Sequence, residues 1–113
     1  MKILWIVNTI FPAPSKVLGL EVPVVGGWMY GMSEKLSANQ NHKLAVACIY
    51  DGSHLKSIEI GHIIYFLIPC KNKSKYDKNL ESVWQQVNDD FCPDIVHIHG
   101  TEYAHGLSCM RQL

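Results

Sequence analysis

Hydrophobic residues form uninterrupted runs at three places in the chain, over residues 3–7, 44–50 and 63–68. A continuous run, as opposed to an alternating one, is typical of a strand covered on both faces in the middle of a parallel sheet. Each run is far shorter than the roughly 20 residues that a membrane-spanning helix requires. The pattern therefore predicts buried strands, and residues 3–7 are expected to form the first central one.

The third run has a neighbouring apolar segment that suggests a strand pair. Ser57–Ile60 and Ile63–Ile68 stand on either side of Gly61 and His62, and Pro69 closes the second segment. Short apolar segments around a glycine-containing dipeptide predict a small hairpin or a bent strand pair.

Apolar residues at helical spacing predict two helices. Met29, Met32 and Leu36 recur at helical intervals after Gly27, and the asparagines within residues 39–41 supply a stop. The second helix is predicted from an apolar stripe that comprises Tyr76, Leu80, Val83, Trp84, Val87 and Phe91.

The segments between these elements complete the outline of the fold. Residues 8–26 hold several prolines and glycines and are expected to form a long loop, which in a compact domain is usually functional. Cys92, Pro93 and Asp94 end the second helix and lead into Ile95–His99, a β-branched strand. The alternation of strands and helices predicts an α/β fold with a doubly wound, parallel sheet.

The amino-acid composition limits the kinds of partner that the chain can bind and the cellular compartment in which it is expected. The chain has 113 residues, is 48% hydrophobic and 18% charged, and carries a formal net charge of zero, which indicates one globular domain over residues 1–113. A neutral chain offers no general attraction for a polyanion, so we expect no nucleic-acid partner. The four widely spaced cysteines are expected to be reduced, which favours a cytoplasmic location.

The first candidate site is the end of the long loop, where Gly26 and Gly27 precede the first predicted helix. Backbone N–H groups at a helix start can receive an anion such as a phosphate, and glycine lets the ligand approach closely. The sequence has neither the dinucleotide glycine motif nor a Walker A loop. A plain tight turn into the helix is the alternative.

The second candidate site lies where the last predicted strand ends. His97 and His99 are two residues apart and therefore face the same side of the strand. We expect His97, deeper in the strand, to be a hydrogen-bonded core histidine, and His99, at the strand mouth, to contact a ligand. Thr101 and Glu102 follow as candidate acceptor-binding or loop residues, and Glu102 is either a base or a solvated acid.

Two further interpretations concern metals and membranes. A His-x-His pair on a strand, together with His105 and Cys109 at helical spacing, could hold zinc, but no matching carboxylate cluster is evident and we expect no metal. Lysines between residues 71 and 78 are interpreted as a solvated bridge, with docking to a membrane surface as the alternative.

Three segments together carry a family resemblance. Lys2–Asn8, the loop that closes on Gly26 and Gly27, and Asp94–Gly100 resemble the N-terminal domain of GT-B glycosyltransferases of the retaining group 1 type, family four. The resemblance covers essentially the whole chain and rests on the order and spacing of its motifs. It implies a Rossmann-like domain that binds the acceptor, a sugar or glycolipid, and faces a second domain across a cleft.

The resemblance also implies roles for individual residues. Gly26 and Gly27 would offer backbone N–H groups to the diphosphate of a nucleotide-sugar donor. His99 would be catalytic, forming a hydrogen bond to the donor sugar or phosphate while the sugar is transferred with retention, and no cofactor is needed. The nucleotide-sugar site of that family lies in a C-terminal domain, so residues 1–113 alone are expected to be an inactive, truncated half. A stand-alone ligand-binding or zinc-dependent domain is the alternative.

Overall fold

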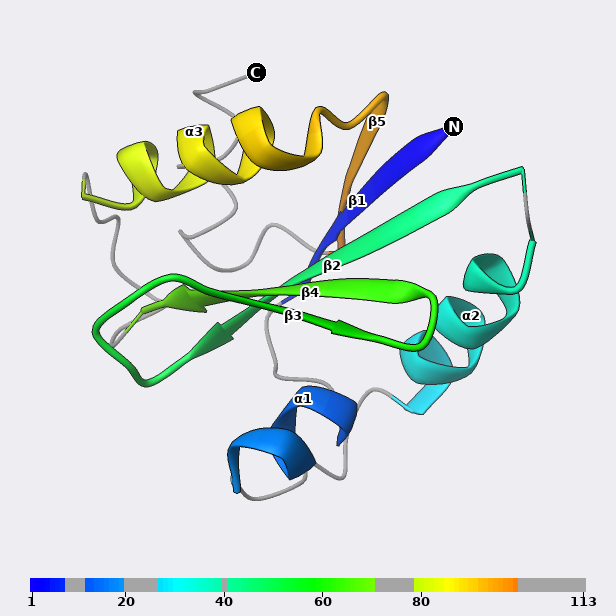
Figure 1. Ribbon diagram of the computed structural model, residues 1–113, viewed down its shortest axis with the longest axis horizontal. Helices are drawn as coiled ribbons and strands as arrows, with labels where there is room; N and C mark the ends of the chain where they lie inside the picture. Colours follow the sequence, from blue (N-terminus) through cyan, green and yellow to red (C-terminus); the bar gives the residue numbers. More distant parts are fainter. Residues whose placement is uncertain (8–11, 20–26, 40, 71–78, 100–113) are drawn as a thin grey trace.

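The computed structural model describes residues 1–7, 12–19, 27–39, 41–70 and 79–99. These residues form one sheet of five strands, with helices packed on both of its faces (Figure 1). The order of the strands across the sheet is β3-β4-β2-β1-β5. The strands are β1 (Lys2–Ile6), β2 (Lys43–Tyr50), β3 (Lys56–Ile60), β4 (Ile63–Pro69) and β5 (Ile95–Ile98).

The directions of the strands confirm an α/β fold with a mostly parallel sheet, which is compatible with a Rossmann-like fold. β1 is parallel to both of its neighbours, β2 and β5, and β2 is parallel to β4. β3 is antiparallel to β4, so the sheet is mixed. The predicted hairpin is confirmed: Gly61, at the first turn position, has a φ of 61°, which a residue with a side chain rarely adopts.

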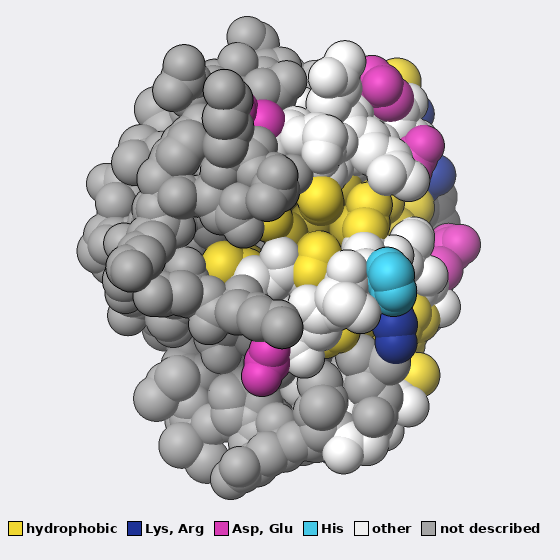
Figure 2. Space-filling view, turned by 90° about the vertical axis from the view of Figure 1, so that its left-hand side faces the viewer, with side chains coloured by type: hydrophobic (Ala, Val, Ile, Leu, Met, Phe, Trp, Pro, Cys, Tyr) yellow, Lys and Arg dark blue, Asp and Glu magenta, His cyan; other side chains and the backbone are white. Residues whose placement is uncertain are grey.

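The parallel strands all point to one edge of the sheet, called the carboxyl edge from here on. Figure 2 views the molecule from the side toward which β2 and β4 point. In the described part of this view, hydrophobic side chains gather in the middle and charged side chains lie nearer the rim. The opposite edge, where the parallel strands begin, is called the amino edge.

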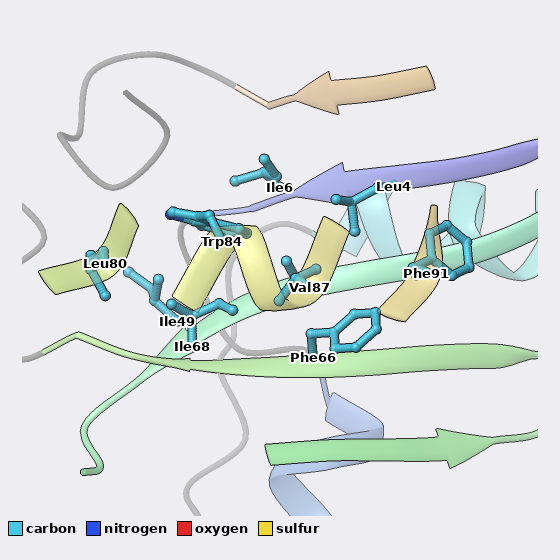
Figure 3. Packing of buried hydrophobic residues seen from close by; sticks show 11 residues of the cluster. Leu4, Ile6, Ile49, Phe66, Ile68, Leu80, Trp84, Val87 and Phe91 are labelled. Atoms are coloured by element: carbon cyan, nitrogen blue, oxygen red, sulfur yellow. The ribbon is translucent and has the colours of Figure 1, made fainter. Parts of the chain in front are cut away.

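One face of the sheet is covered by α3 (Asn79–Phe91), which begins inside the predicted range 76–91 and ends where that range ends. Its buried residues pack on side chains from three neighbouring strands, as Figure 3 shows. Trp84 is 0% exposed and is the largest fully buried side chain in the described part of the chain. The cluster on this face includes Leu4, Ile6, Ile49, Phe66, Ile68, Leu80, Trp84, Val87 and Phe91.

The other face is covered by α1 (Pro12–Leu18) and α2 (Gly27–Ser37). α2 lies where the first helix was predicted, but α1 corrects the expectation of a continuous loop over residues 8–26. Pro12 is the first residue of α1 and Pro14 the third, positions where the missing N–H has no helical acceptor to lose, so both prolines are compatible with this short helix. None of the helices that the structure describes is long and apolar enough to cross a membrane.

The start of β5 is fixed to the start of β1 by a reciprocal pair of hydrogen bonds. The backbone N–H of Lys2 donates to Asp94 Oδ2 at 2.7 Å, and the N–H of Asp94 donates to the carbonyl of Lys2 at 2.8 Å. Lys2 Nζ also donates to the carbonyl of Phe91 at 3.2 Å, at the last turn of α3. These contacts set the register in which Trp5 of β1 is paired with His97 of β5.

Candidate functional site

The strand order reverses between β1 and β5. From β1 the chain passes α1 and α2 on one face to reach β2, on one side of β1. From β4 it passes α3 on the other face to reach β5, on the opposite side of β1. In open α/β sheets, ligands bind beyond the carboxyl ends of the strands at this kind of reversal. The candidate site is therefore the carboxyl end of β1 and β5.

Backbone hydrogen bonds fix both chain segments at this reversal. The N–H of His99 donates to the carbonyl of Ile6 at 2.9 Å, which holds the residue after β5 beside the end of β1. The N–H of Val7 donates to the carbonyl of Ala47 at 3.1 Å, which holds the residue after β1 beside β2. His99 thus lies at the carboxyl edge, as the sequence predicted, in a defined backbone setting.

Two aromatic rings surround the half-buried imidazole of His99. The centroid of the Trp5 ring lies 4.5 Å from that of His99, with the ring planes at 64°. The His97 ring stacks on His99 with centroids 4.1 Å apart and planes at 24°. The Trp5 and His97 rings lie 6.2 Å apart at 80°, so the three rings form one cluster on one face of the sheet.

The prediction that His97 is a core histidine is wrong, because its side chain is exposed. β5 lies at the end of the strand order and is paired only with β1 among the described strands. The main strand contacts of the two helices on this face are elsewhere: α2 contacts β2 and α1 contacts β3. His97 therefore stacks on His99 from the solvent side.

The setting of His99 favours its uncharged form. Burial lowers the pKa of this imidazole from its ordinary value of 6.5, and the positive charge of His97 lowers it further. At pH 7 the ring is then neutral, with one nitrogen that donates and one that accepts a hydrogen bond. A neutral imidazole can donate a hydrogen bond to an oxygen atom, including a phosphate oxygen, or accept one from a hydroxyl group.

The predicted helix start at Gly27 is confirmed, because α2 begins at this residue. Its backbone N–H is one of the first four of the helix, which have no acceptor within the helix itself. The other predicted site residues, Gly26, Thr101 and Glu102, lie outside the described residues. The same holds for the lysines between residues 71 and 78.

The metal alternative finds no ligand cluster in the part of the chain that is described. Over residues 1–7, 12–19, 27–39, 41–70 and 79–99, no three histidine, cysteine, aspartate or glutamate side chains are grouped to hold a metal ion. His105 and Cys109, which the zinc interpretation also needs, lie outside these ranges.

A second structured loop at the carboxyl edge was missed by sequence reasoning. It follows β2, where the hydroxyl of Tyr50 donates to the carbonyl of His54. The ammonium group of Lys56 lies 6.0 Å from the centroid of the Tyr50 ring, a cation–π distance. The carbonyl of Tyr50 also accepts from the N–H of Cys70 at 3.0 Å, which joins the ends of β2 and β4. The dipeptide Asp51-Gly52 was the available signal, but it indicated only a turn.

Two open depressions lie at the amino edge, on the opposite side from His99. They have volumes of about 350 and 450 Å³ and share His42 and Lys43 as lining residues. Nδ1 of His42 is buried without a hydrogen-bond partner. Glu59 and Asp94 bring negative charge to the two depressions, so their lining favours no single class of ligand.

Comparisons of the chain with models of known families, with curated proteins and with solved structures gave no match.

Proposed function

We propose that this chain is the acceptor-side, N-terminal domain of a retaining glycosyltransferase that uses a nucleotide-sugar donor. In this proposal a second α/β domain, C-terminal to residue 113, binds the nucleotide, and transfer takes place in the cleft between the two domains. The acceptor is a sugar or a glycolipid. The 113 residues by themselves bind substrate groups without transferring the sugar.

The observation that carries the proposal is the position of His99 at the carboxyl end of β5, beside the end of β1, where the strand order reverses. A ligand bound at this reversal meets a half-buried, neutral imidazole whose backbone is fixed to β1. Along the chain, α1 follows β1, and α2, which begins at Gly27, follows α1. This arrangement supports the resemblance of Lys2–Asn8 and Asp94–Gly100 to the glycosyltransferase domain.

Each residue then has a limited task in the transfer. The imidazole of His99 donates a hydrogen bond to an oxygen of the donor, either on the sugar or on the diphosphate, and strengthens this bond as the glycosidic linkage breaks. The N–H of Gly27 at the start of α2 is available for the departing diphosphate, where the helix dipole favours negative charge. The carboxyl-edge loop after β2 is available to the acceptor.

The proposal is tested with the protein encoded by the longest reading frame that contains this sequence. A panel of nucleotide sugars is incubated with simple sugar acceptors, and the anomeric configuration of any product is read by proton NMR. His99→Ala is compared with His62→Ala, which alters another histidine that is exposed and lies in the β3–β4 turn at the amino edge.

We expect transfer with retention, a kcat lowered by roughly 10²–10³-fold in His99→Ala, as for loss of one hydrogen bond to a developing charge, and an unchanged kcat in His62→Ala. Absence of transfer with every donor, or equal activity of the two variants, would overturn the proposal. Circular dichroism of both variants confirms that the comparison is between folded proteins.

A further inference from the structure

The His99 imidazole is in contact with two rings that come from different strands. Trp5 belongs to β1 and is 3% exposed, whereas His97 belongs to β5 and is exposed. We propose that Trp5 and His97 are positioning residues for His99, holding its imidazole in one orientation and in its uncharged form. This inference rests on the proposed function in one respect: the proposed function names the sugar transfer in which His99 takes part.

Trp5 provides a fixed wall because it cannot move without disturbing the core. Its ring is part of the buried cluster on the α2 face, together with Val7 and Val46. The His99 ring meets it at a centroid distance of 4.5 Å, in an edge-to-face arrangement that aromatic pairs favour. Rotation of the imidazole toward β1 is blocked by this ring.

His97 covers a second side of the imidazole, and its centroid lies 6.2 Å from that of Trp5. With centroids 4.1 Å apart and planes only 24° from parallel, the two imidazoles are in stacking contact. Hydrogen bonds fix the backbone at both ends of β5. At the start, Asp94 bonds to Lys2, and at the end, the N–H of His99 donates to the carbonyl of Ile6. The stack therefore follows from the strand geometry, because residues two apart on one strand face the same side.

The contact between the two imidazoles also disfavours a positive charge on both rings at once. Of the described rings in contact with His99, β5 contributes the imidazole of His97 and β1 contributes Trp5, which carries no charge. A proton on the exposed His97 opposes a second proton on His99, and burial opposes it as well. A neutral imidazole has one donor and one acceptor nitrogen, whereas a charged imidazole has donors only.

The test separates orientation from charge by means of two substitutions at residue 97. His97→Phe keeps a flat ring on His99 and removes the charge, and His97→Ala removes both. Ring signals of His99 are followed by NMR across pH 4–9, together with nuclear Overhauser contacts between residues 5 and 99. His62→Phe, at the amino edge, is the matched control.

We expect the pKa of His99 to rise toward its ordinary value in both variants at residue 97 and to stay unchanged in His62→Phe. Contacts between Trp5 and His99 persist in His97→Phe and weaken in His97→Ala. If the titration and the contacts of His99 are the same in all these proteins, the role of His97 is overturned. Trp5→Phe tests the contact on the β1 side. If the contacts around His99 are unaltered in this variant, the positioning role of Trp5 is overturned.

In the active protein, the low-pH limb of kcat/KM moves to higher pH in His97→Phe, because His99 then becomes charged at a higher pH. In His97→Ala kcat also falls, on the order of tenfold, because the ring is no longer held. The NMR titration needs no turnover. An inactive protein that gives the expected shifts removes the transferase proposal alone, whereas an active protein without them removes the positioning proposal alone.

Discussion

Replacement of Gly52 by alanine is expected to destabilise the carboxyl-edge loop through a clash with one side chain. A Cβ added at Gly52 would lie 2.2 Å from Cε2 and 2.6 Å from the hydroxyl oxygen of Tyr50. Real Cβ atoms essentially never approach heavy atoms this closely, so the Tyr50 ring must swing away. The backbone of Gly52 does not lie in the left-handed region, so the clash, and not the conformation of residue 52, decides the effect.

The loss in free energy of unfolding can be worked out from the contacts that the Tyr50 ring loses when it moves. Moving the ring removes the hydrogen bond from Tyr50 to His54, about 1 kcal/mol, and its contact with the Lys56 ammonium, about 0.5 kcal/mol. A ring displaced from its preferred rotamer costs about 1 kcal/mol more. Alanine restricts the unfolded chain and returns about 0.4–1 kcal/mol. The expected net loss in free energy of unfolding is about 1–2 kcal/mol.

Urea denaturation of four variants measures this effect. Gly31→Ala is the matched control, because Gly31 lies within α2 with nothing near its added Cβ, and it should stabilise the protein by about 0.5–1 kcal/mol. In a Tyr50→Val background the clash is absent, so Gly52→Ala should become stabilising by about 0.4–1 kcal/mol. If Gly52→Ala stabilises the protein that retains Tyr50 as much as Gly31→Ala does, the reasoning is refuted.

Three other predictions concern the core, a helix end and a buried phenol. Trp84→Ala should lower the free energy of unfolding by about 3–5 kcal/mol in urea denaturation, because the side chain is fully buried under α3, and a loss below about 1 kcal/mol would contradict that packing. Cys92 follows α3 with a φ of 51°, so Cys92→Gly should raise the melting temperature, equivalent to about 0.5–1 kcal/mol, and a lower melting temperature would contradict this. Burial, with the nearby Cys48 and Glu34, raises the pKa of Tyr65 from 10.0 to about 12, so its contribution to stability should be complete below pH 10 and lost as the pH rises toward 12. Stability measured over that window should fall in the wild type and fall less in Tyr65→Phe, and parallel curves would count against the assignment.

The strands could be predicted from the sequence because burial on both faces leaves a local signal. The runs at residues 3–7, 44–50 and 63–68 coincide with β1, β2 and β4, and the glycine turn gave the β3–β4 hairpin. That this hairpin would lie at the edge of the sheet, with β4 next to β2, depends on how distant segments pair. Short-range periodicity carries no information on that pairing.

The short helix α1 was not predicted, because the prolines and glycines in residues 8–26 argue against a long helix and leave no signal for a short one. Pro12 and Pro14 both fall in the first turn of α1, where proline is tolerated. Its seven residues are too few to show an amphipathic period. Composition alone therefore could not separate this helix from a loop.

The candidate site was only partly predictable. The place of His99 at a strand mouth followed from Ile95–His99 being a strand that precedes a glycine. The exposure of His97 did not follow, because it depends on β5 lying at the edge of the described sheet. The contact between Trp5 and His99 did not follow either, since it requires the register of β5 on β1.

The central claim is that substrate groups bind at the carboxyl end of β1 and β5. The most direct test is amide chemical-shift mapping of the protein during titration with nucleotide sugars and simple sugar acceptors. We predict that the largest shifts occur at Val7, Gly27 and His99. Shifts centred on His42 and Lys43 at the amino edge, or none with any of these compounds, would contradict the claim.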